Sequence, residues 1–149
     1  MKIKTILIIE DDLDLLKDTK EALEKQGYKT ICCSSIVKAK EAIRRQPTFN
    51  LVFTDLNLVT TGLNDCETNK SYGSMIAGWI FIKNYIFTNP VYKNMPYVIR
   101  SAFVDDLYEY IDKFGDEDEK KLLKKEACFE KIDDDQVVFN YMKRILGVV

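Results

Sequence analysis

The sequence alternates short apolar runs with amphipathic stretches, and this alternation constrains the fold more than any other feature. Residues 6–9 are all Ile or Leu and end abruptly at Glu10, Asp11 and Asp12. A run that is apolar on both faces is typical of a buried parallel strand. Further strands are expected over residues 29–33, 49–54, 97–102 and 127–131.

Helical patterns separate these runs. Leu16 and Leu23 lie on one face of a helix that Gly27 ends, and Ser35 can cap a second helix that runs to about residue 46. Strands that alternate with helices form a parallel sheet covered on both faces. The sequence therefore predicts one flavodoxin-like (βα)5 α/β domain over residues 1–149, with a doubly wound five-stranded parallel sheet. The remaining helices are expected over residues 75–88, 105–125 (interrupted near Gly115) and 135–146.

Charge and hydropathy exclude several classes of partner. The 22 basic and 24 acidic residues give a net charge of −2, which offers no broad attraction for nucleic acid or an anionic membrane. No apolar run approaches the roughly 20 residues that span a bilayer. Residues 1–5 lead directly into the first apolar run and do not resemble a signal peptide. We expect a cytoplasmic protein that binds neither nucleic acid nor membrane directly.

The chain contains no histidine, which limits its chemistry. A Ser-His-Asp triad, a histidine zinc site and a phosphohistidine carried by this chain are all excluded. Cys32, Cys33 and Cys128 lie in apolar, strand-like segments and are expected to be buried thiols. The chemistry must come from carboxylates, hydroxyls, lysines and a bound metal.

Polar residues follow the predicted strands where functional groups of doubly wound sheets gather. Glu10 and Asp11 follow the first strand, Asp55 the third, Ser101 lies near the end of the fourth, and Lys131 follows the fifth. Several carboxylates in one crevice repel one another unless a cation compensates, and Mg²⁺ prefers such oxygen ligands. A hydroxyl and an ammonium group would suit phosphoryl oxygens.

Four segments resemble the signatures of response-regulator receiver domains. They are ILIIEDD (residues 6–12), NLVFTDLNLV (50–59), YVIRSA (97–102) and ACFEKI (127–132). They occur in the order that the family has, and each falls at a strand end. The resemblance covers essentially the whole chain.

The resemblance implies a role for each polar residue at these strand ends. Asp55 corresponds to the phosphoacceptor. Glu10 and Asp11 correspond to the acidic pair that holds Mg²⁺, with Asp11 as a direct ligand. Asn57, two residues after the acceptor, would supply its backbone carbonyl to the ion.

By the same resemblance, Ser101 is the switch hydroxyl and Lys131 is the lysine of the family. The phosphoryl donor would be a partner histidine kinase or histidine phosphotransfer protein, because this chain has no histidine. Output would pass by conformational change to a downstream protein target. Such a domain is regulatory, not an enzyme with an external substrate.

The chain departs from the family in the segment that follows Asp55. Val59 stands where the family has proline, and the matching glycine is Gly78, 23 residues after Asp55. These positions imply an inserted loop over residues 59–77, longer than ordinary connections. We expect the insertion to form a flap beside the site that tunes partner choice or the lifetime of the aspartyl phosphate.

A second departure lies near Lys131. Ile132 follows it where the family has a proline, often with a cis bond, so we expect a trans bond here. The aromatic switch position is ambiguous. Counting back from Lys131 puts Cys128 there, with Phe129 next to it.

Two alternative functions remain open from the sequence. A pseudo-receiver would bind partners without phosphorylation. A haloacid-dehalogenase-type phosphohydrolase would use Asp12 and Asp14 after the first strand, although the Thr or Val of that motif is missing. Taken singly, Asp11 or Asp12 could instead cap a helix, and Asp55 could be a turn residue.

Overall fold

Five parallel strands form one sheet in the order β2-β1-β3-β4-β5. The computed structural model describes residues 2–147, so residues 1 and 148–149 of the predicted domain lie outside the description. β3 is the middle strand and pairs with β1 and β4. The strands are β1 (Thr5–Ile9), β2 (Lys29–Cys33), β3 (Leu51–Thr54), β4 (Tyr97–Arg100) and β5 (Cys128–Phe129).

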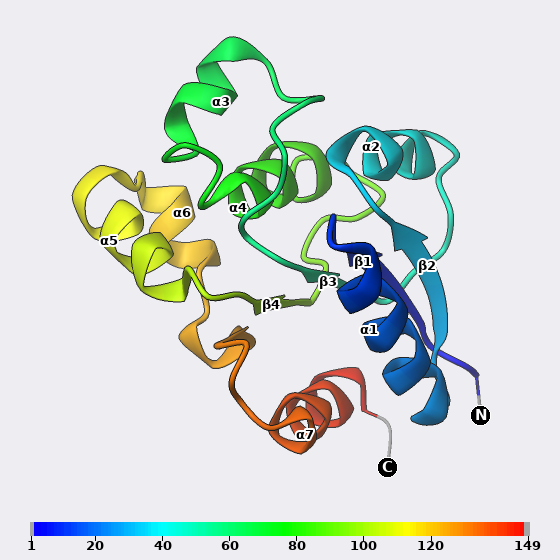
Figure 1. The fold of residues 1–149 in the computed structure, drawn as a ribbon. Helices are drawn as coiled ribbons and strands as arrows, with labels where there is room; N and C mark the ends of the chain where they lie inside the picture. The colour runs from blue at the N-terminus through cyan, green and yellow to red at the C-terminus, as the bar shows by residue number, and fades with distance from the viewer. Residues whose placement is uncertain (1, 148–149) are drawn as a thin grey trace.

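Helices cover both faces of the sheet (Figure 1). α1 and α7 lie on one face, and α2 and α4 on the other. This arrangement confirms the predicted doubly wound, flavodoxin-like fold. The helices are α1 (Leu13–Lys25), α2 (Ile36–Arg44), α3 (Asp65–Lys70), α4 (Ala77–Phe81), the π-helix η1 (Ile82–Ile86), α5 (Val104–Phe114), α6 (Glu117–Leu122), the 3₁₀ helix η2 (Lys125–Ala127) and α7 (Asp135–Leu146).

Local sequence signals fix the ends of the first two helices. The side chain of Asp12 accepts hydrogen bonds from the backbone N–H groups of Asp14 and Leu15, so Asp12 is the N-cap of α1. Ser35 caps α2 as predicted, accepting from the N–H of Lys38. Gly27 follows α1 with a φ of 94°, a left-handed conformation that glycine adopts without strain.

Three predicted strands are longer in the sequence pattern than in the structure, and β3 begins only at Leu51. β4 ends at Arg100 and β5 contains only Cys128 and Phe129. Ser101 still donates its backbone N–H to the carbonyl of Phe129, and the chain then turns into α5. The site residues therefore lie on the turns that follow the strands.

The prediction that Cys32 is buried is wrong. Cys33 is buried and Cys128 is half-buried, but Cys32 is exposed. Cys32 is exposed because it belongs to β2, which is at the edge of the sheet and has a neighbouring strand on one side only. The helices cover the side chains of this edge strand incompletely.

The segment over residues 59–77 is not a plain loop. The prediction is wrong for residues 65–70, which form α3. Asn64 and Glu67 make a reciprocal capping box at its start. Glu67 is buried, and its carboxylate also accepts hydrogen bonds from Asn84 Nδ2 and the Tyr85 hydroxyl, both at 2.8 Å. These bonds fasten α3 to η1.

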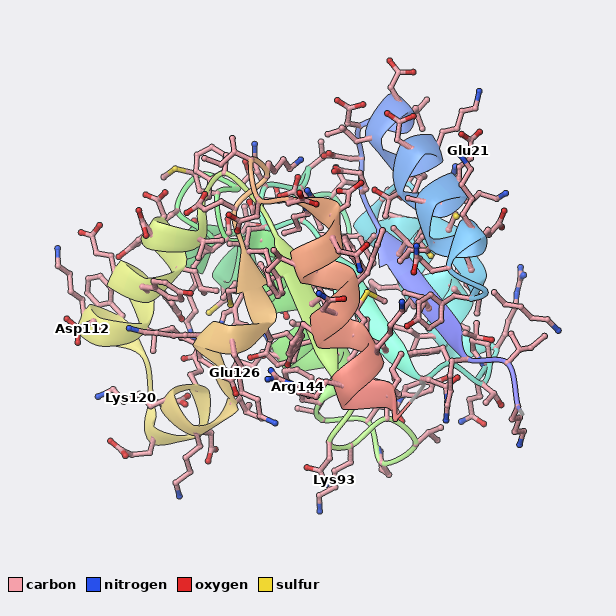
Figure 2. The ribbon with its side chains drawn as sticks, turned by 90° about the horizontal axis from the view of Figure 1, so that it is seen from below. Glu21, Lys93, Asp112, Lys120, Glu126 and Arg144 are labelled. Atoms are coloured by element: carbon pink, nitrogen blue, oxygen red, sulfur yellow. The ribbon has the colours of Figure 1, made fainter. Side chains whose placement is uncertain are left out.

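Acidic and basic side chains both lie on the surface of the protein. Charged side chains such as Glu21, Lys93 and Asp112 project away from the ribbon core (Figure 2). Over residues 2–147, no helix has the length and apolar character that crossing a membrane requires.

Replacing Glu67 with alanine should loosen α3 while leaving the sheet folded. The change removes the acceptor of three hydrogen bonds, one of them in the capping box, and should cost about 2 kcal/mol. Hydrogen–deuterium exchange should speed up over residues 64–72 and stay unchanged in β1 and β3. Asp65→Ala, at an exposed position in the same helical turn, is the matched control. Equal exchange in the two variants would contradict this fastening role.

Candidate functional site

The hydrogen-bond pattern of the sheet continues one residue beyond β1 and β3 and brings their polar residues together. Glu10 N donates to the carbonyl of Cys33 at 3.1 Å, and Asp55 N donates to that of Ile9 at 3.1 Å. Because neighbouring parallel strands end at one edge, Glu10 and Asp55 lie side by side there. Both are buried, with 8% and 6% of their surface exposed.

Lys131 joins the two carboxylates. Its Nζ lies 2.7 Å from Asp55 Oδ2 and 3.1 Å from Glu10 Oε1. The lysine comes from the loop between β5 and α7, 121 residues after Glu10. The first, third and fifth strands thus contribute to one cluster, as the sequence predicts.

Backbone groups hold the other oxygen of Asp55. Oδ1 accepts from the N–H groups of Leu56 at 2.6 Å and Asn57 at 3.2 Å. Gly78, in α4, packs directly against this turn and donates its N–H to the carbonyl of Leu56 at 2.9 Å. A Cβ at Gly78 would overlap the carbonyl oxygen of Asp55. The glycine therefore allows α4 to approach the acidic residue closely.

The electrostatics of the cluster reflect an excess of negative charge. Burial, followed by the charge of Asp55, raises the pKa of Glu10 to about 7, against the opposing effect of Lys131. Burial alone would lower the pKa of Lys131, but its hydrogen bond with Asp55 and the charges of Asp55 and Glu10 outweigh burial and raise it. One ammonium group thus compensates two buried carboxylates.

Asp11 and Asn57 lie beside this cluster and bind the ends of the 59–77 segment. Asp11 Oδ2 accepts from the N–H of Val59 at 3.0 Å. Asn57 Oδ1 accepts from the Ser74 hydroxyl at 2.7 Å. Ser74 has a φ of 86°, a backbone conformation that costs energy for residues other than glycine. The segment is therefore fixed next to Asp55 at both ends, while its predicted effect on partner choice or phosphoryl lifetime stays a prediction.

Oxygen donors around Asp55 suit a hard divalent cation. In the metal site predicted from the sequence, Glu10, Asp11 and Asp55 would supply carboxylates and Asn57 a backbone carbonyl, the ligand types that Mg²⁺ prefers. The surplus charge of Glu10 and Asp55 also fits a cation in addition to Lys131. Within the described part of the chain, no three acidic or cysteine side chains are grouped so that they alone could hold a metal. Water and the Asn57 carbonyl would have to complete the coordination.

Ser101 lies at the end of β4 and is fully buried. Its Oγ accepts from the N–H of Phe103 at 3.2 Å, so the hydroxyl contacts the start of α5. Cys128 and Phe129, the two residues at the ambiguous aromatic position, have different surroundings. Phe129 is buried against Tyr141, with ring centroids 5.6 Å apart, and Cys128 is half-buried with its Sγ 3.5 Å from the Lys124 carbonyl.

A cavity of about 280 Å³ opens beside Asp55 between α1 and α7. Asp55, Glu10 and Lys131 line it together with the apolar side chains of Phe53 and Phe139. The acidic cluster can therefore be approached from this side of the sheet.

Sequence reasoning missed Arg100, which also lines this cavity. Its guanidinium contacts Asp135 and the loop that carries Lys131. One signal was present in the sequence: an arginine at the end of an otherwise apolar buried strand, with acidic residues 133–135 later in the chain.

The fold and the acidic cluster define a doubly wound α/β protein with an acidic site at the carboxyl ends of its strands.

No family model matches the sequence, and neither does any curated protein. Solved structures do match. A CheY-like response regulator receiver domain from Methylobacillus flagellatus has a TM-score of 0.69 at 23% identity, covering 97% of this chain and 99% of that one.

Two further solved structures have the same fold. A chemotaxis response regulator of Vibrio cholerae gives a TM-score of 0.68 at 14% identity over 97% of this chain and 100% of its own. A response regulator receiver protein from Sinorhizobium medicae gives 0.66 at 18% identity over 98% and 96%. The chain therefore has the CheY-like receiver fold over nearly its whole length.

Replacing Gly78 with alanine should destabilise the protein by at least about 2 kcal/mol, because the new methyl group meets the backbone of Asp55 and Leu56 and no flexible side chain that could yield. Urea unfolding measures this loss. Gly147→Ala is the control, since a Cβ there meets nothing within 4 Å and the cost of its positive φ is only about 1 kcal/mol. Similar losses in the two variants would show that close packing on Asp55 does not matter.

Proposed function

We propose that this chain is a response-regulator receiver that accepts a phosphoryl group on Asp55 in a Mg²⁺-dependent reaction. The observation that carries the proposal is the buried Asp55 carboxylate at the end of the middle strand, 2.7 Å from Lys131 Nζ and beside Glu10. The receiver fold around this cluster supports the same function.

The proposed reaction is a nucleophilic displacement at phosphorus. A carboxylate oxygen of Asp55 forms a bond to the phosphorus of a partner's phosphohistidine. The P–N bond breaks, and its electron pair stays on the imidazole nitrogen, which takes up a proton from water. A small acyl phosphate could serve as donor in the same way, with a carboxylate as the leaving group.

The residues around Asp55 have separate roles in this step. The N–H groups of Leu56 and Asn57 orient the carboxylate through Oδ1. Lys131 offsets negative charge on the transferring group, and the fixed geometry lowers the entropic part of the barrier. Asp11, Asp55 and the Asn57 carbonyl would hold Mg²⁺, with Glu10 acting through water. When bound, the ion would neutralise charge on the phosphoryl oxygens.

Ser101 is the proposed switch that reports phosphorylation. Its hydroxyl accepts from Phe103 N–H in the present structure. An aspartyl phosphate would offer it strong acceptor oxygens, and turning toward them would shift the start of α5. We propose that a downstream protein binds the shifted state, and that a histidine kinase or phosphotransfer protein supplies the phosphoryl group.

The phosphohydrolase alternative receives no support from the residues that it would need. Asp12 caps α1 with its carboxylate, and Asp14 is exposed in the first helical turn. Neither residue is among those that line the cavity beside Asp55.

Asp55→Asn should abolish phosphoryl incorporation from acetyl phosphate and Mg²⁺, because the amide is a poor nucleophile. The amide oxygen can still accept from Leu56 N–H, so the turn should stay intact. Intact mass measures incorporation, and circular dichroism checks the fold. The control Asp14→Asn, at an exposed site, should react like the wild type. A phosphorylated species that persists in Asp55→Asn would overturn the proposal.

Asp11→Asn should weaken Mg²⁺ binding by more than about tenfold, since it removes a charged ligand. Asparagine still offers an oxygen to the N–H of Val59, which keeps the 59–77 segment in place. Isothermal titration calorimetry measures the affinity, again with Asp14→Asn as the control. If Asp11→Asn bound Mg²⁺ as tightly as the wild type, the metal assignment would be wrong.

A further inference from the structure

Lys131 lies on a loop that is not paired with any strand of the sheet. β5 ends at Phe129, two residues earlier, and α7 begins only at Asp135. Ile132, the next residue, is 94% exposed and so contributes almost no packing. The bond between them is trans, like every peptide bond described over residues 2–147. Something other than strand pairing must fix the position of the Lys131 side chain.

Arg100 binds this loop at several points. Its Nη1 donates to Asp135 Oδ1 at 2.6 Å, an ion pair with the first residue of α7. Its Nη2 donates to the carbonyl of Asp133 at 2.5 Å and makes a long contact of 3.5 Å with that of Lys131. The arginine thus spans the loop from Lys131 to the start of α7.

The loop itself is a tight turn that Arg100 ties to the sheet. Asp133 Oδ2 accepts from Glu130 N–H at 2.8 Å, and the N–H of Asp133 donates to the carbonyl of Glu130 at 3.1 Å. These bonds shape the turn but do not connect it to β4. Arg100 makes that connection because it is the last residue of β4.

The chemistry of the guanidinium group suits this role. Its planar fork can donate to several acceptors in fixed directions, whereas the ammonium group of a lysine is a compact point charge. Arg100 is largely buried, with 20% of its side chain exposed, which reduces competition from water. It lines the same cavity as Asp55 and Lys131.

We propose that Arg100 is a positioning residue: it holds the loop over residues 130–135 so that Lys131 Nζ keeps its ion pair with Asp55. The inference rests on the proposed phosphoryl transfer for its effect on rate. Arg100 itself contacts neither Asp55 nor Glu10 in the hydrogen bonds and ion pairs of the described residues, so it acts through Lys131.

The first test is a double-mutant cycle on the rate of phosphoryl incorporation from acetyl phosphate with Mg²⁺. Arg100→Gln should slow the reaction at least about tenfold, because the lysine is no longer held in place. The same change made in a Lys131→Gln protein should slow it no further. Arg144→Gln, at an exposed arginine of α7 (Figure 2), is the control and should react normally.

The second test does not depend on phosphorylation. Amide hydrogen exchange over residues 130–135 should be at least about tenfold faster in Arg100→Gln, with β1 and β3 unchanged. Asp135→Asn, a milder change that removes only the charge of one partner, should move exchange and rate in the same direction by less. It also serves if Arg100→Gln fails to fold.

Either of two results would overturn the inference: unchanged exchange over residues 130–135, or an equal loss of rate with and without Lys131. If the wild-type protein takes up no phosphoryl group, the proposed function fails. The exchange measurement then decides alone whether Arg100 holds the loop, so the two failures are distinguishable.

Discussion

The structure depends on one electrostatic constraint, the burial of Glu10 and Asp55 next to each other at the carboxyl ends of β1 and β3. Burial, followed by repulsion from the charge of Asp55, raises the pKa of Glu10 to about 7. Lys131 offsets this repulsion with contacts of 2.7 and 3.1 Å, but only if the last loop of the domain reaches the first strand. These ion pairs therefore link the end of β1 to the loop that precedes α7. A phosphoryl group or a divalent cation arriving there would change the charge balance on which this link rests.

The helical segment beside Asp55, α4 with η1, is held by two buried glutamates. Glu67 fastens α3 to η1, and Glu119, at the start of α6, accepts from Trp79 Nε1 at 2.9 Å and pairs with Lys83 at 3.3 Å. In both cases the glutamate is also the third residue of its short helix and closes a capping box with the N-cap residue, so one carboxylate both caps the helix and docks it. With α4 fixed in this way, Gly78 can remain against Asp55. The π-helix η1 that follows α4 carries contacts with both glutamates, and such helices often occur near functional sites.

The sequence was most informative where an apolar run and the polar residue that follows it together mark the end of a strand. Buried apolar runs that stop at acidic residues predicted the sheet and the meeting of Glu10, Asp55 and Lys131. α3 was missed because its six residues carry almost no apolar side chains, although Asn64 and Glu67 have the spacing of a capping box. The contacts of Arg100 could not be predicted, since they join residues more than thirty positions apart through a loop whose shape no local pattern fixes. Cys32 was misjudged because strand order, and hence the edge position of β2, does not follow from the composition of the strand.

We propose that Asp55 is a phosphoacceptor whose reactivity depends on Lys131 and a divalent cation. Nuclear magnetic resonance of the isotopically labelled protein, titrated with beryllium fluoride in the presence and absence of Mg²⁺, tests it most directly, because beryllium fluoride forms a stable mimic of the aspartyl phosphate. We expect changes in chemical shift only when Mg²⁺ is present, centred on Asp55, Ser101 and the loop of Lys131, and extending to the start of α5. Spectra that stay unchanged with Mg²⁺ present, or shifts centred away from Asp55, would contradict the account.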